Sequence, residues 1–261
     1  MKTLGIIPAR FASTRFPGKP LVKIKGKTMI QRVYEQCSKA PSLAKVIVAT
    51  DDQRIYDHVL AFGGKARMTD KNHLTGTDRI AEVAALEKEF DWVVNIQGDE
   101  PFIHPKQIET VLNIFKENQN APIATGVRPI ANQADIFNPN VVKATFGKNG
   151  KALLFSRSPI PFLRNEAKEN WSPHHFFKHI GIYAFRREVL LEITKLPPSR
   201  LEKLESLEQL RWLEHGYDIF IAELPFDSVG IDTPEDLENL TLSAKVKQAD
   251  TSSRDIETNE R

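Results

Sequence analysis

Three cationic side chains, Arg10, Arg15 and Lys19, stand near the start of the chain. They follow an apolar run over residues 4–7, whose length and β-branched content predict a buried strand. In open α/β sheets, ligands bind beyond the carboxyl ends of the strands. Small residues in the stretch 9–19, hereafter the basic loop, let backbone N–H groups approach an anion, so the loop suits a nucleoside triphosphate. A solvated basic loop without a ligand explains three cations equally well.

Two better-known phosphate signatures are absent from this region. Pro8 is expected to end the strand, because proline cannot donate to a sheet ladder, and no G-x-G-x-x-G follows it. The pair Gly18-Lys19 lacks both the upstream glycine and the following Ser or Thr of a Walker loop. The sequence therefore disfavours an ordinary kinase, GTPase or dehydrogenase.

Asp99 is the first candidate metal ligand. It follows a predicted strand over 92–96 and has a glycine, Gly98, directly before it. Magnesium takes hard oxygen ligands, usually one or two carboxylates completed by water and substrate phosphates, so one aspartate at this place can help to hold the ion on a triphosphate. An equally good interpretation is that Asp99 or Glu100 only shapes the turn before Pro101.

Asp232 is the second candidate, in the late segment G-I-D-T-P-E-D. One interpretation pairs Asp232 with Glu235 in a helix capping box, which would leave it no other role. The alternative takes Thr233 as the N-cap with Pro234 in the first helical position, which leaves the Asp232 carboxylate free. In the second case, Asp99 and Asp232 can share metal ions.

The segment 73–79 precedes a predicted helix that begins near Ile80. Its Thr, Gly and Asp residues are typical of helix capping, and the same groups can also read a pyrimidine edge. Asp51 and Asp52 likewise follow a predicted strand, at 45–50, where an Asp-Asp-Gln sequence commonly caps a helix. Spacing alone does not choose between capping and ligand binding at either place.

Strand-like and helix-like segments alternate along the chain. Further strands are predicted over 123–127 and 179–185. The spacing of apolar residues predicts amphipathic helices over 29–38, 54–62, 80–90 and 105–118. Such alternation predicts an α/β fold with a mostly parallel sheet that helices cover on both faces.

Three later regions differ from this pattern. The region 141–171 is rich in proline and aromatic residues and is expected to be an inserted hairpin or subdomain with a second role, such as sugar binding or dimer contact. Leucines at every third position predict one strong helix over 201–215 that packs on the body of the protein. A single domain is predicted over 1–242, followed by a disordered polar tail over 243–261.

Size and charge bound the function further. A chain of 261 residues can bury a full core, and a net charge of +2 is too balanced for a nucleic-acid-binding surface. The single cysteine, Cys37, excludes an internal disulfide and a cysteine-based zinc site. The apolar stretch after Lys2 is too short for a secretory signal, and no run reaches transmembrane length. We therefore expect a cytoplasmic protein without a membrane partner.

Together these motifs resemble one family closely, the 3-deoxy-manno-octulosonate (Kdo) cytidylyltransferases, or CMP-Kdo synthetases. The resemblance runs from about residue 2 to about residue 240 and leaves only the tail uncovered. It is carried by ordered blocks: IIPARFASTRFPGKPL at 6–21, ATDD at 49–52, TGTDRIAEV at 75–83, VNIQGDEP at 94–101, FNPNVVK at 137–143, FSRSPIPF at 155–162, HIGIYAF at 179–185, LEQLRWLEHG at 207–216 and GIDTPEDLE at 230–238.

The resemblance implies a Rossmann-like nucleotidyltransferase fold with a smaller inserted sugar-binding or dimerisation region, a homodimer, and a requirement for Mg²⁺. It also implies that CTP and Kdo give CMP-Kdo and diphosphate, for lipopolysaccharide biosynthesis. In the mechanism that follows from it, the anomeric hydroxyl of Kdo attacks the α-phosphorus of CTP in line, without a covalent enzyme intermediate.

The family's site residues map onto this chain by motif. The basic loop would hold the triphosphate, the block 73–79 would lie against the cytosine and ribose, and Arg157 is expected to meet the Kdo carboxylate. Asp99 and Asp232 match the magnesium ligands and, with Arg10, Arg15 and Lys19, are the expected catalytic residues. The expected CTP contacts are Ala9, Arg10, Ser13, Arg15, Lys19, Thr75, Gly76, Thr77, Arg79 and Gln97, and the expected sugar contacts are Arg157, His179, Glu208 and Gln209.

Other interpretations stay open. A cytidylyltransferase for another acid sugar, such as 8-amino-Kdo or a sialic acid, would share the triphosphate half. A noncatalytic nucleotide-binding protein on the same fold would be expected to lack one of the metal aspartates, whereas this chain has both Asp99 and Asp232. His179 can equally be a structural histidine whose ring is satisfied by a backbone carbonyl.

Overall fold

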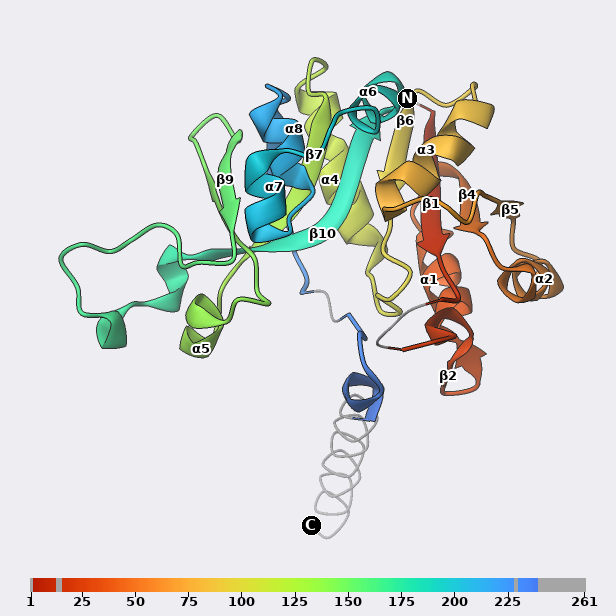
Figure 1. Cartoon of the computed structure of the whole chain (residues 1–261), viewed down its shortest axis with the longest axis horizontal. Helices are drawn as coiled ribbons and strands as arrows, with labels where there is room; N and C mark the ends of the chain where they lie inside the picture. The colour runs from red at the N-terminus through yellow and green to blue at the C-terminus, as the bar shows by residue number, and fades with distance from the viewer. Residues whose placement is uncertain (1, 13–15, 228–229, 239–261) are drawn as a thin grey trace, which may run out of the picture.

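The computed structural model describes residues 2–12, 16–227 and 230–238 of the chain. Its centre is a mixed sheet (Figure 1). Along the main path of the sheet, the central antiparallel strand is Phe177–Arg186, and the other neighbouring pairs are parallel. The strand order is β11 (Ile219–Glu223), β7 (Ile123–Pro129), β10 (Phe177–Arg186), β6 (Trp92–Asn95), β1 (Thr3–Ala9), β4 (Leu43–Thr50) and β5 (Ala66–Met68).

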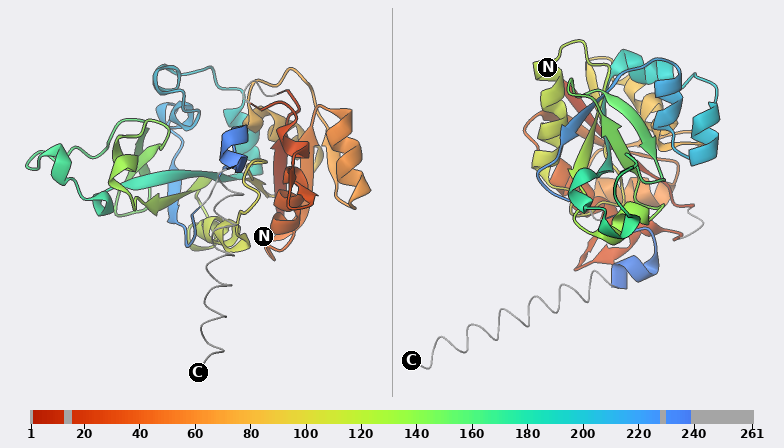
Figure 2. Two further views of the ribbon diagram at one scale, coloured as in Figure 1. Left: turned by 90° about the horizontal axis from the view of Figure 1, so that it is seen from below. Right: turned by 90° about the vertical axis from the view of Figure 1, so that its left-hand side faces the viewer.

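Helices cover both faces of this sheet (Figure 2). Successive side chains of a strand point to opposite faces of the sheet. Accordingly, Leu4 and Ile6 of β1 join one apolar core and Ile7 joins the other. The predicted α/β sheet, mostly parallel and covered on both sides, is confirmed. The Ile7 core includes α1 (Met29–Cys37), α2 (Gln53–Ala61) and α4 (Pro105–Glu117), and the Leu4 core includes α3 (Gly76–Leu86), α6 (Arg187–Ile193) and α8 (Gln209–Glu214).

Side-chain caps set where the predicted helices begin. Thr28 accepts a hydrogen bond at the start of α1, and Asp52 accepts one at the start of α2. Thr75 and Asp78 form a capping box, so α3 begins at Gly76 and not near Ile80 as predicted. The residues of the block 73–79 therefore lie in and just before the first turn of α3.

The prediction that Pro8 ends the first strand is wrong, because β1 continues beside β4 to Ala9. The Ile6 carbonyl accepts a hydrogen bond from the Ile96 N–H on the β6 side of the strand. Pro8, two residues further on, faces the same side. The β6 strand has already ended there, at Asn95, so no neighbouring strand requires a donor from Pro8.

The predicted helix over 201–215 is also wrong as a single element. The chain instead forms α7 (Arg200–Glu205) and α8, which are separated at Ser206, where φ is 51°. The break lets Leu207 and Leu210 enter the core, while Leu204 stays exposed. In a straight helix, leucines at every third position would point in gradually changing directions around the axis. The turn at Ser206 divides the segment, so that the leucines after it can face the core. Packing of this region on the body of the protein is confirmed.

The region 141–171 contains the expected hairpin, formed by β8 (Lys143–Phe146) and β9 (Ala152–Ser156). The β8 strand also pairs with the start of β10, which Figure 1 shows as a long bent strand. A register shift against β7, between Ile180 and Tyr183, marks the bend. Beyond it lies a separate small core of Ile130, Ile136, Trp171 and Phe176.

The shorter elements are η1 (Lys19–Leu21), β2 (Lys23–Ile24), β3 (Lys27–Thr28), α5 (Gln133–Phe137), η2 (Lys168–Asn170) and η3 (Pro173–His175), and a last helix over 234–238. The predicted tail over 243–261 lies outside the described residues, so it and the domain boundary at 242 stay predictions. None of the helices in the described ranges is long and apolar enough to cross a membrane.

Candidate active site

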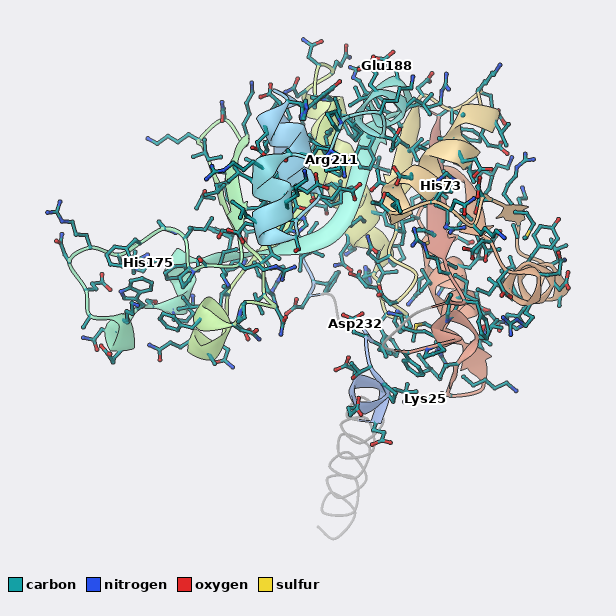
Figure 3. The ribbon with its side chains drawn as sticks, viewed as in Figure 1. Lys25, His73, His175, Glu188, Arg211 and Asp232 are labelled. Carbon is teal, nitrogen blue, oxygen red and sulfur yellow. The ribbon has the colours of Figure 1, made fainter. Side chains whose placement is uncertain are left out.

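Lys19 links the two predicted metal ligands. Its Nζ lies 2.8 Å from Asp99 Oδ2 and 3.2 Å from Asp232 Oδ1. Lys19 opens η1, and Asp99 lies in the loop after β6. Asp232, labelled in Figure 3, leads into the last described helix. The fold thus gathers at one point three charged side chains that are far apart in the sequence. They meet beyond the carboxyl ends of parallel strands, where open sheets bind ligands.

Thr233 caps the last described helix, so the cap does not use the Asp232 carboxylate. Thr233 Oγ1 accepts a hydrogen bond from the Asp236 N–H at 3.2 Å, and Asp236 Oδ2 accepts the N–H groups of both Asp232 and Thr233 at 2.9 Å. The capping box is therefore Thr233 with Asp236, and the alternative box of Asp232 with Glu235 is wrong. The sequence interpretation missed Asp236, although the spacing Thr-x-x-Asp carries its signal.

Backbone contacts bring the two aspartates together. The Ile231 N–H donates to the Asp99 carbonyl at 3.0 Å, and the Ile231 side chain is fully buried in a small apolar cluster. Gly98 approaches the end of β1 so closely that a Cβ on it would lie 2.8 Å from the Pro8 carbonyl oxygen. A side chain at position 98 would therefore push Asp99 away from Lys19.

Asp99 and Asp232 fit a hard divalent cation. Both offer carboxylate oxygens, the ligands that Mg²⁺ prefers, and both already contact one shared cation, the Lys19 ammonium. The Asp99 side chain is 29% exposed and the Asp232 side chain 49% exposed. Water and phosphate oxygens can therefore reach the carboxylates and complete a coordination shell.

Arg10 is the second described cation of the basic loop. Its Nη2 atom is buried and has no hydrogen-bond partner among the described residues. Burial lowers the pKa of Arg10, and the positive charge of nearby Arg79 lowers it further. A phosphate oxygen would satisfy such a nitrogen. Ala9, the last residue of β1, is buried beside it in the chain, whereas Ser13 and Arg15 lie outside the described residues.

Arg79 is fully buried and bonded to its neighbours. Its Nη2 donates to Asp51 Oδ2 at 2.7 Å, and its Nη1 donates to Thr69 Oγ1. Asp51 thus serves as the counter-charge of Arg79, while Asp52 is the helix cap that the sequence suggested. A direct contact of Arg79 with CTP stays a prediction. Its observed contacts tie α3 to the ends of β4 and β5.

The block 75–77 caps a helix and also reaches the second half of the chain. Thr75 Oγ1 accepts the Asp78 N–H, and Thr77 Oγ1 donates to Glu208 Oε2 at 2.8 Å. Gly76 faces the ring of Pro8. The capping interpretation is therefore confirmed, and the contacts of these residues with cytosine and ribose stay predictions.

Glu208 and Gln209 stand at the start of α8. Burial raises the pKa of Glu208 above the ordinary value for glutamate, although the hydrogen bond from Thr77 opposes this. Gln209 is buried. The bond between Thr77 and Glu208 places an expected sugar contact against an expected CTP contact.

The bend of β10 positions two other expected contacts. The side-chain amide nitrogen of Gln97, Nε2, donates to the Gly181 carbonyl at 3.0 Å. The His179 Nε2 lies 2.9 Å from Thr125 Oγ1, and burial lowers the His179 pKa to about 3, so the ring is neutral at pH 7. Thr125, which also donates to the Ile182 carbonyl at 2.7 Å, is a residue that the sequence interpretation missed, because no local motif marks it.

Arg157 is held by backbone carbonyls. Its guanidinium donates to the carbonyls of Glu205 at 2.7 Å, Pro139 at 2.9 Å and Ser206 at 3.4 Å. These bonds join the hairpin strand β9 to the turn between α7 and α8. A contact of Arg157 with a sugar carboxylate stays a prediction and would exchange some of these bonds.

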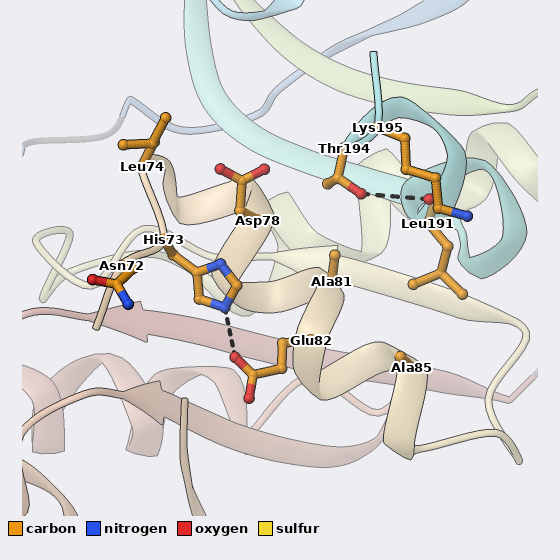
Figure 4. Close-up of a pocket in the computed structure, with 10 residues that line it drawn as sticks. All are labelled: Asn72, His73, Leu74, Asp78, Ala81, Glu82, Ala85, Leu191, Thr194 and Lys195. Carbon is orange, nitrogen blue, oxygen red and sulfur yellow. Dashed lines mark hydrogen bonds and ion pairs between the residues drawn. The ribbon is translucent and has the colours of Figure 1, made fainter. Parts of the chain in front are cut away.

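A separate pocket of about 590 Å³ lies between α3 and α6 (Figure 4). Its lining includes His73 and Asp78 from the predicted nucleotide block, but none of Lys19, Asp99 and Asp232. His73 Nε2 lies 2.5 Å from Glu82 Oε2 in this pocket. The charged cluster, and not this pocket, therefore has the groups that triphosphate chemistry requires.

Comparisons with known proteins find similar chains along most of this sequence. The family model described as Cytidylyltransferase matches residues 4–219. A 3-deoxy-manno-octulosonate cytidylyltransferase of Cytophaga hutchinsonii is 53% identical over 241 residues, which cover 91% of this chain and 96% of the relative. The enzyme of the same name from Parabacteroides distasonis is 54% identical over 244 residues, covering 91% of this chain and 96% of the relative.

A solved structure is also similar along almost the whole chain. It is described as CMP:2-keto-3-deoxy-manno-octonic acid synthetase complexed with CTP, with 44% identity and a TM-score of 0.87. The match covers 94% of this chain and 99% of that one. The chain belongs to the cytidylyltransferase family and, within it, to the 3-deoxy-manno-octulosonate cytidylyltransferases.

Proposed function

We propose that this chain transfers the CMP group of CTP to Kdo, giving CMP-Kdo and diphosphate for lipopolysaccharide biosynthesis. The observation that carries the assignment to particular residues is the Lys19 ammonium between the carboxylates of Asp99 and Asp232. This cluster combines a cation for phosphate oxygens with two carboxylates for a metal. The names of the relatives at about half identity support CTP and Kdo as the substrates.

The residues of the basic loop would bind the triphosphate. Arg10 has a buried nitrogen that lacks a partner among the described residues, which a phosphate oxygen would satisfy. Ser13 and Arg15 would add contacts from the same loop. Lys19 would neutralise the charge that grows on diphosphate as the bond from the α-phosphorus to the leaving oxygen breaks.

Asp99 and Asp232 would hold Mg²⁺. The bound ion would lower the pKa of the attacking anomeric hydroxyl and screen the phosphate charges. With both carboxylates engaged in this way, the Lys19 ammonium would turn from them to a phosphate oxygen.

The sugar would bind between the bend of β10 and the start of α8. Glu208 and Gln209 would contact its hydroxyls, and the neutral His179 would serve as a hydrogen-bonding group without charge. Thr77 would align the nucleotide with the sugar through its bond to Glu208. Arg157 would neutralise the sugar carboxylate.

We further propose that the chain works as a homodimer in the cytoplasm. Two exposed apolar side chains of the region 141–171, Leu153 and Phe162, support a protein contact there. The single cysteine is free and buried, as suits a reducing compartment. Size-exclusion chromatography with light scattering tests the dimer, and a monomer at micromolar concentration would contradict it.

Diphosphate release tests the reaction and the sugar. The purified chain is incubated with CTP and Mg²⁺ and, in parallel, with Kdo, 8-amino-Kdo or a sialic acid. We expect release with Kdo to exceed release with the other sugars in kcat/KM. Preference for a different sugar would overturn the assignment of Kdo, and CTP binding without any release would favour a noncatalytic nucleotide-binding protein.

A further inference from the structure

The ring of Phe11, near the start of the basic loop, contacts Arg54 on α2 and Gly18 near the end of the loop. The guanidinium carbon of Arg54, on α2, lies 3.3 Å from the centre of the ring. At the far end of the loop, Gly18 lies so close that a Cβ on it would be 3.2 Å from ring carbons Cε2 and Cζ. Phe11 also packs against the main apolar core. One side chain therefore connects the start of the loop, its end, and the body of the protein.

A backbone hydrogen bond closes the loop at the same place. The Gly18 N–H donates to the Phe11 carbonyl at 2.9 Å, and Gly18 has a φ of 71°, in the left-handed region that favours glycine. Phe11 directly follows Arg10, and Gly18 directly precedes Lys19. The contact between Phe11 and Gly18 therefore sets how the two described cations of the loop stand relative to each other.

Arg54 is held in place although its side chain is 60% exposed. Its Nε donates to Asp52 Oδ1 at 2.9 Å, and its Nη2 donates to Asp52 Oδ2 at 2.7 Å. Asp52 Oδ1 also accepts the Arg54 N–H at 3.0 Å as the N-cap of α2. A bidentate bond of this kind fixes the plane of a guanidinium, which an exposed arginine otherwise lacks.

We propose that Arg54 and Phe11 form a clamp that positions Arg10 and Lys19, the described cations of the basic loop, for the triphosphate, with Asp52 holding Arg54. The inference rests on the proposed role of Arg10 and Lys19 in binding phosphate. Arg54 and Phe11 are positioning residues, since they act through the loop. The physical reason is preorganisation: when Arg10 and Lys19 already hold their positions before CTP arrives, less conformational entropy is lost on binding.

Kinetics with both substrates test the clamp. Arg54→Ala and Phe11→Leu are each expected to raise KM for CTP roughly two- to fivefold, the range that an exposed cation–π contact corresponds to. KM for Kdo is expected to stay at the wild-type value. The double variant is expected to be no worse than the more impaired single variant, because either change opens the same clamp. Independent effects that multiply in the double variant would overturn the clamp.

Arg54→Lys separates the clamp from a simple charge effect. Lysine keeps the positive charge but cannot bond Asp52 in the bidentate manner, so Arg54→Lys is expected to resemble Arg54→Ala. If KM for CTP is raised in Arg54→Ala but stays at the wild-type value in Arg54→Lys, the positive charge alone explains the effect. That result would overturn the clamp. Because position 54 is on the surface, Arg54→Ala and Arg54→Lys are both expected to keep the wild-type Tm. These two variants therefore test the clamp even if Phe11→Leu folds poorly.

Two controls complete the experiment. Gln53→Ala, in the same exposed turn of α2, removes a bond to Asp57 and is expected to leave KM for CTP unchanged. Lys19→Ala tests the proposed function in the same assay. Unchanged CTP kinetics in Lys19→Ala would refute the proposed triphosphate site. Impaired Lys19→Ala together with wild-type kinetics in the Arg54 variants would refute the clamp alone.

Discussion

The proposed metal site is short of positive charge. Asp99 and Asp232 carry two negative charges, and Lys19 supplies one positive charge between them. Both carboxylates are partly exposed and stay in contact with water. A divalent cation can therefore reach them without the large desolvation cost of a buried site. The arrangement would therefore favour the proposed Mg²⁺, and without the ion the same carboxylates would repel a triphosphate.

Changing either aspartate to its amide tests this at the residue scale. Asp99→Asn or Asp232→Asn is expected to lower kcat about 100-fold or more, because the amide keeps the size of the side chain but is a weaker ligand. The measurement is steady-state diphosphate release at saturating CTP and Kdo, with Tm as the check on folding. Asp218→Asn is the matched control, since Asp218 is also 49% exposed and also pairs with a lysine, Lys151, at 2.6 Å. Near-normal turnover in either site variant would refute its metal role.

Lys19→Ala separates phosphate binding from sugar binding. We expect kcat/KM for CTP to fall about 100-fold or more, because the ammonium would no longer neutralise the leaving diphosphate. KM for Kdo is expected to change little. Initial rates measured while each substrate is varied in turn give both values. An effect confined to KM for Kdo would contradict the assignment.

At the scale of the elements, Ser206 decides how the segment 200–214 packs. Its φ of 51° is costly for a residue with a Cβ, and glycine adopts it freely. Ser206→Gly is therefore expected to raise the free energy of unfolding by roughly 1 kcal/mol in urea titrations. Ser206→Ala, which keeps a Cβ, is the matched control and is expected to give no gain. Equal effects of the two changes would show that the backbone at 206 is not strained.

Glu87 joins the end of α3 to two strands. It pairs with Lys45 on β4 at 2.5 Å and with Arg67 on β5 at 2.9 Å. Burial raises its pKa, but the hydrogen bonds and charges of Lys45 and Arg67 prevail, so the pKa lies below the ordinary value. These pairs therefore stabilise the fold above the ordinary glutamate pKa, and the stabilisation is lost as the pH falls through the lowered pKa of the folded state.

Glu87→Gln is accordingly expected to cost about 1–3 kcal/mol of unfolding free energy at pH 7. The difference from wild type is expected to shrink as the pH falls below about 4, because both chains then carry a neutral group. Urea titrations over a pH series measure this. Glu35→Gln is the control, since the Glu35 pair with Lys27 is exposed and is expected to be worth less than about 1 kcal/mol. A gap that persists in acid would contradict the ion-pair explanation.

At the scale of the whole molecule, ligand binding is expected to raise the thermal stability of the folded chain. CTP that binds only the folded chain raises Tm, and a concentration of 100 times Kd corresponds to about 2.7 kcal/mol. We expect CTP with Mg²⁺ to raise Tm more than CTP alone, and Asp99→Asn to remove that extra increment. Differential scanning fluorimetry measures it, with Asp218→Asn as the control. Equal increments with and without Mg²⁺ in the wild-type chain would contradict a shared metal and nucleotide site.

Local patterns predicted the elements well where the periodicity was strong. The strands β1, β4, β6, β7 and β10 and the helices α1 to α4 follow from runs of apolar residues and from cap residues such as Thr28 and Asp52. The strands β5 and β11 and the helix α6 were not predicted. The pattern failed at Pro8 and Ser206. Pro8 has no N–H to donate, but it faces the side of β1 on which β6 has already ended. The sequence could not show this, because it depends on where β6 ends. At Ser206, the drift of the leucines is relieved by a left-handed turn that no glycine announces.

The sequence by itself determined the family of this protein, because its ordered motifs from about residue 2 to about residue 240 can be read without knowing how the chain packs. It also named Lys19, Asp99 and Asp232 as candidates for one site. Only the tertiary structure decided that one ammonium meets both carboxylates, and that Arg79 and Arg157 are bonded to neighbours. It also decided that Thr233 with Asp236, and not Asp232 with Glu235, forms the capping box of the last described helix. The reason is physical: spacing constrains residues within a few turns of each other, whereas hydrogen bonds and charges between distant segments are set when the sheet and helices pack.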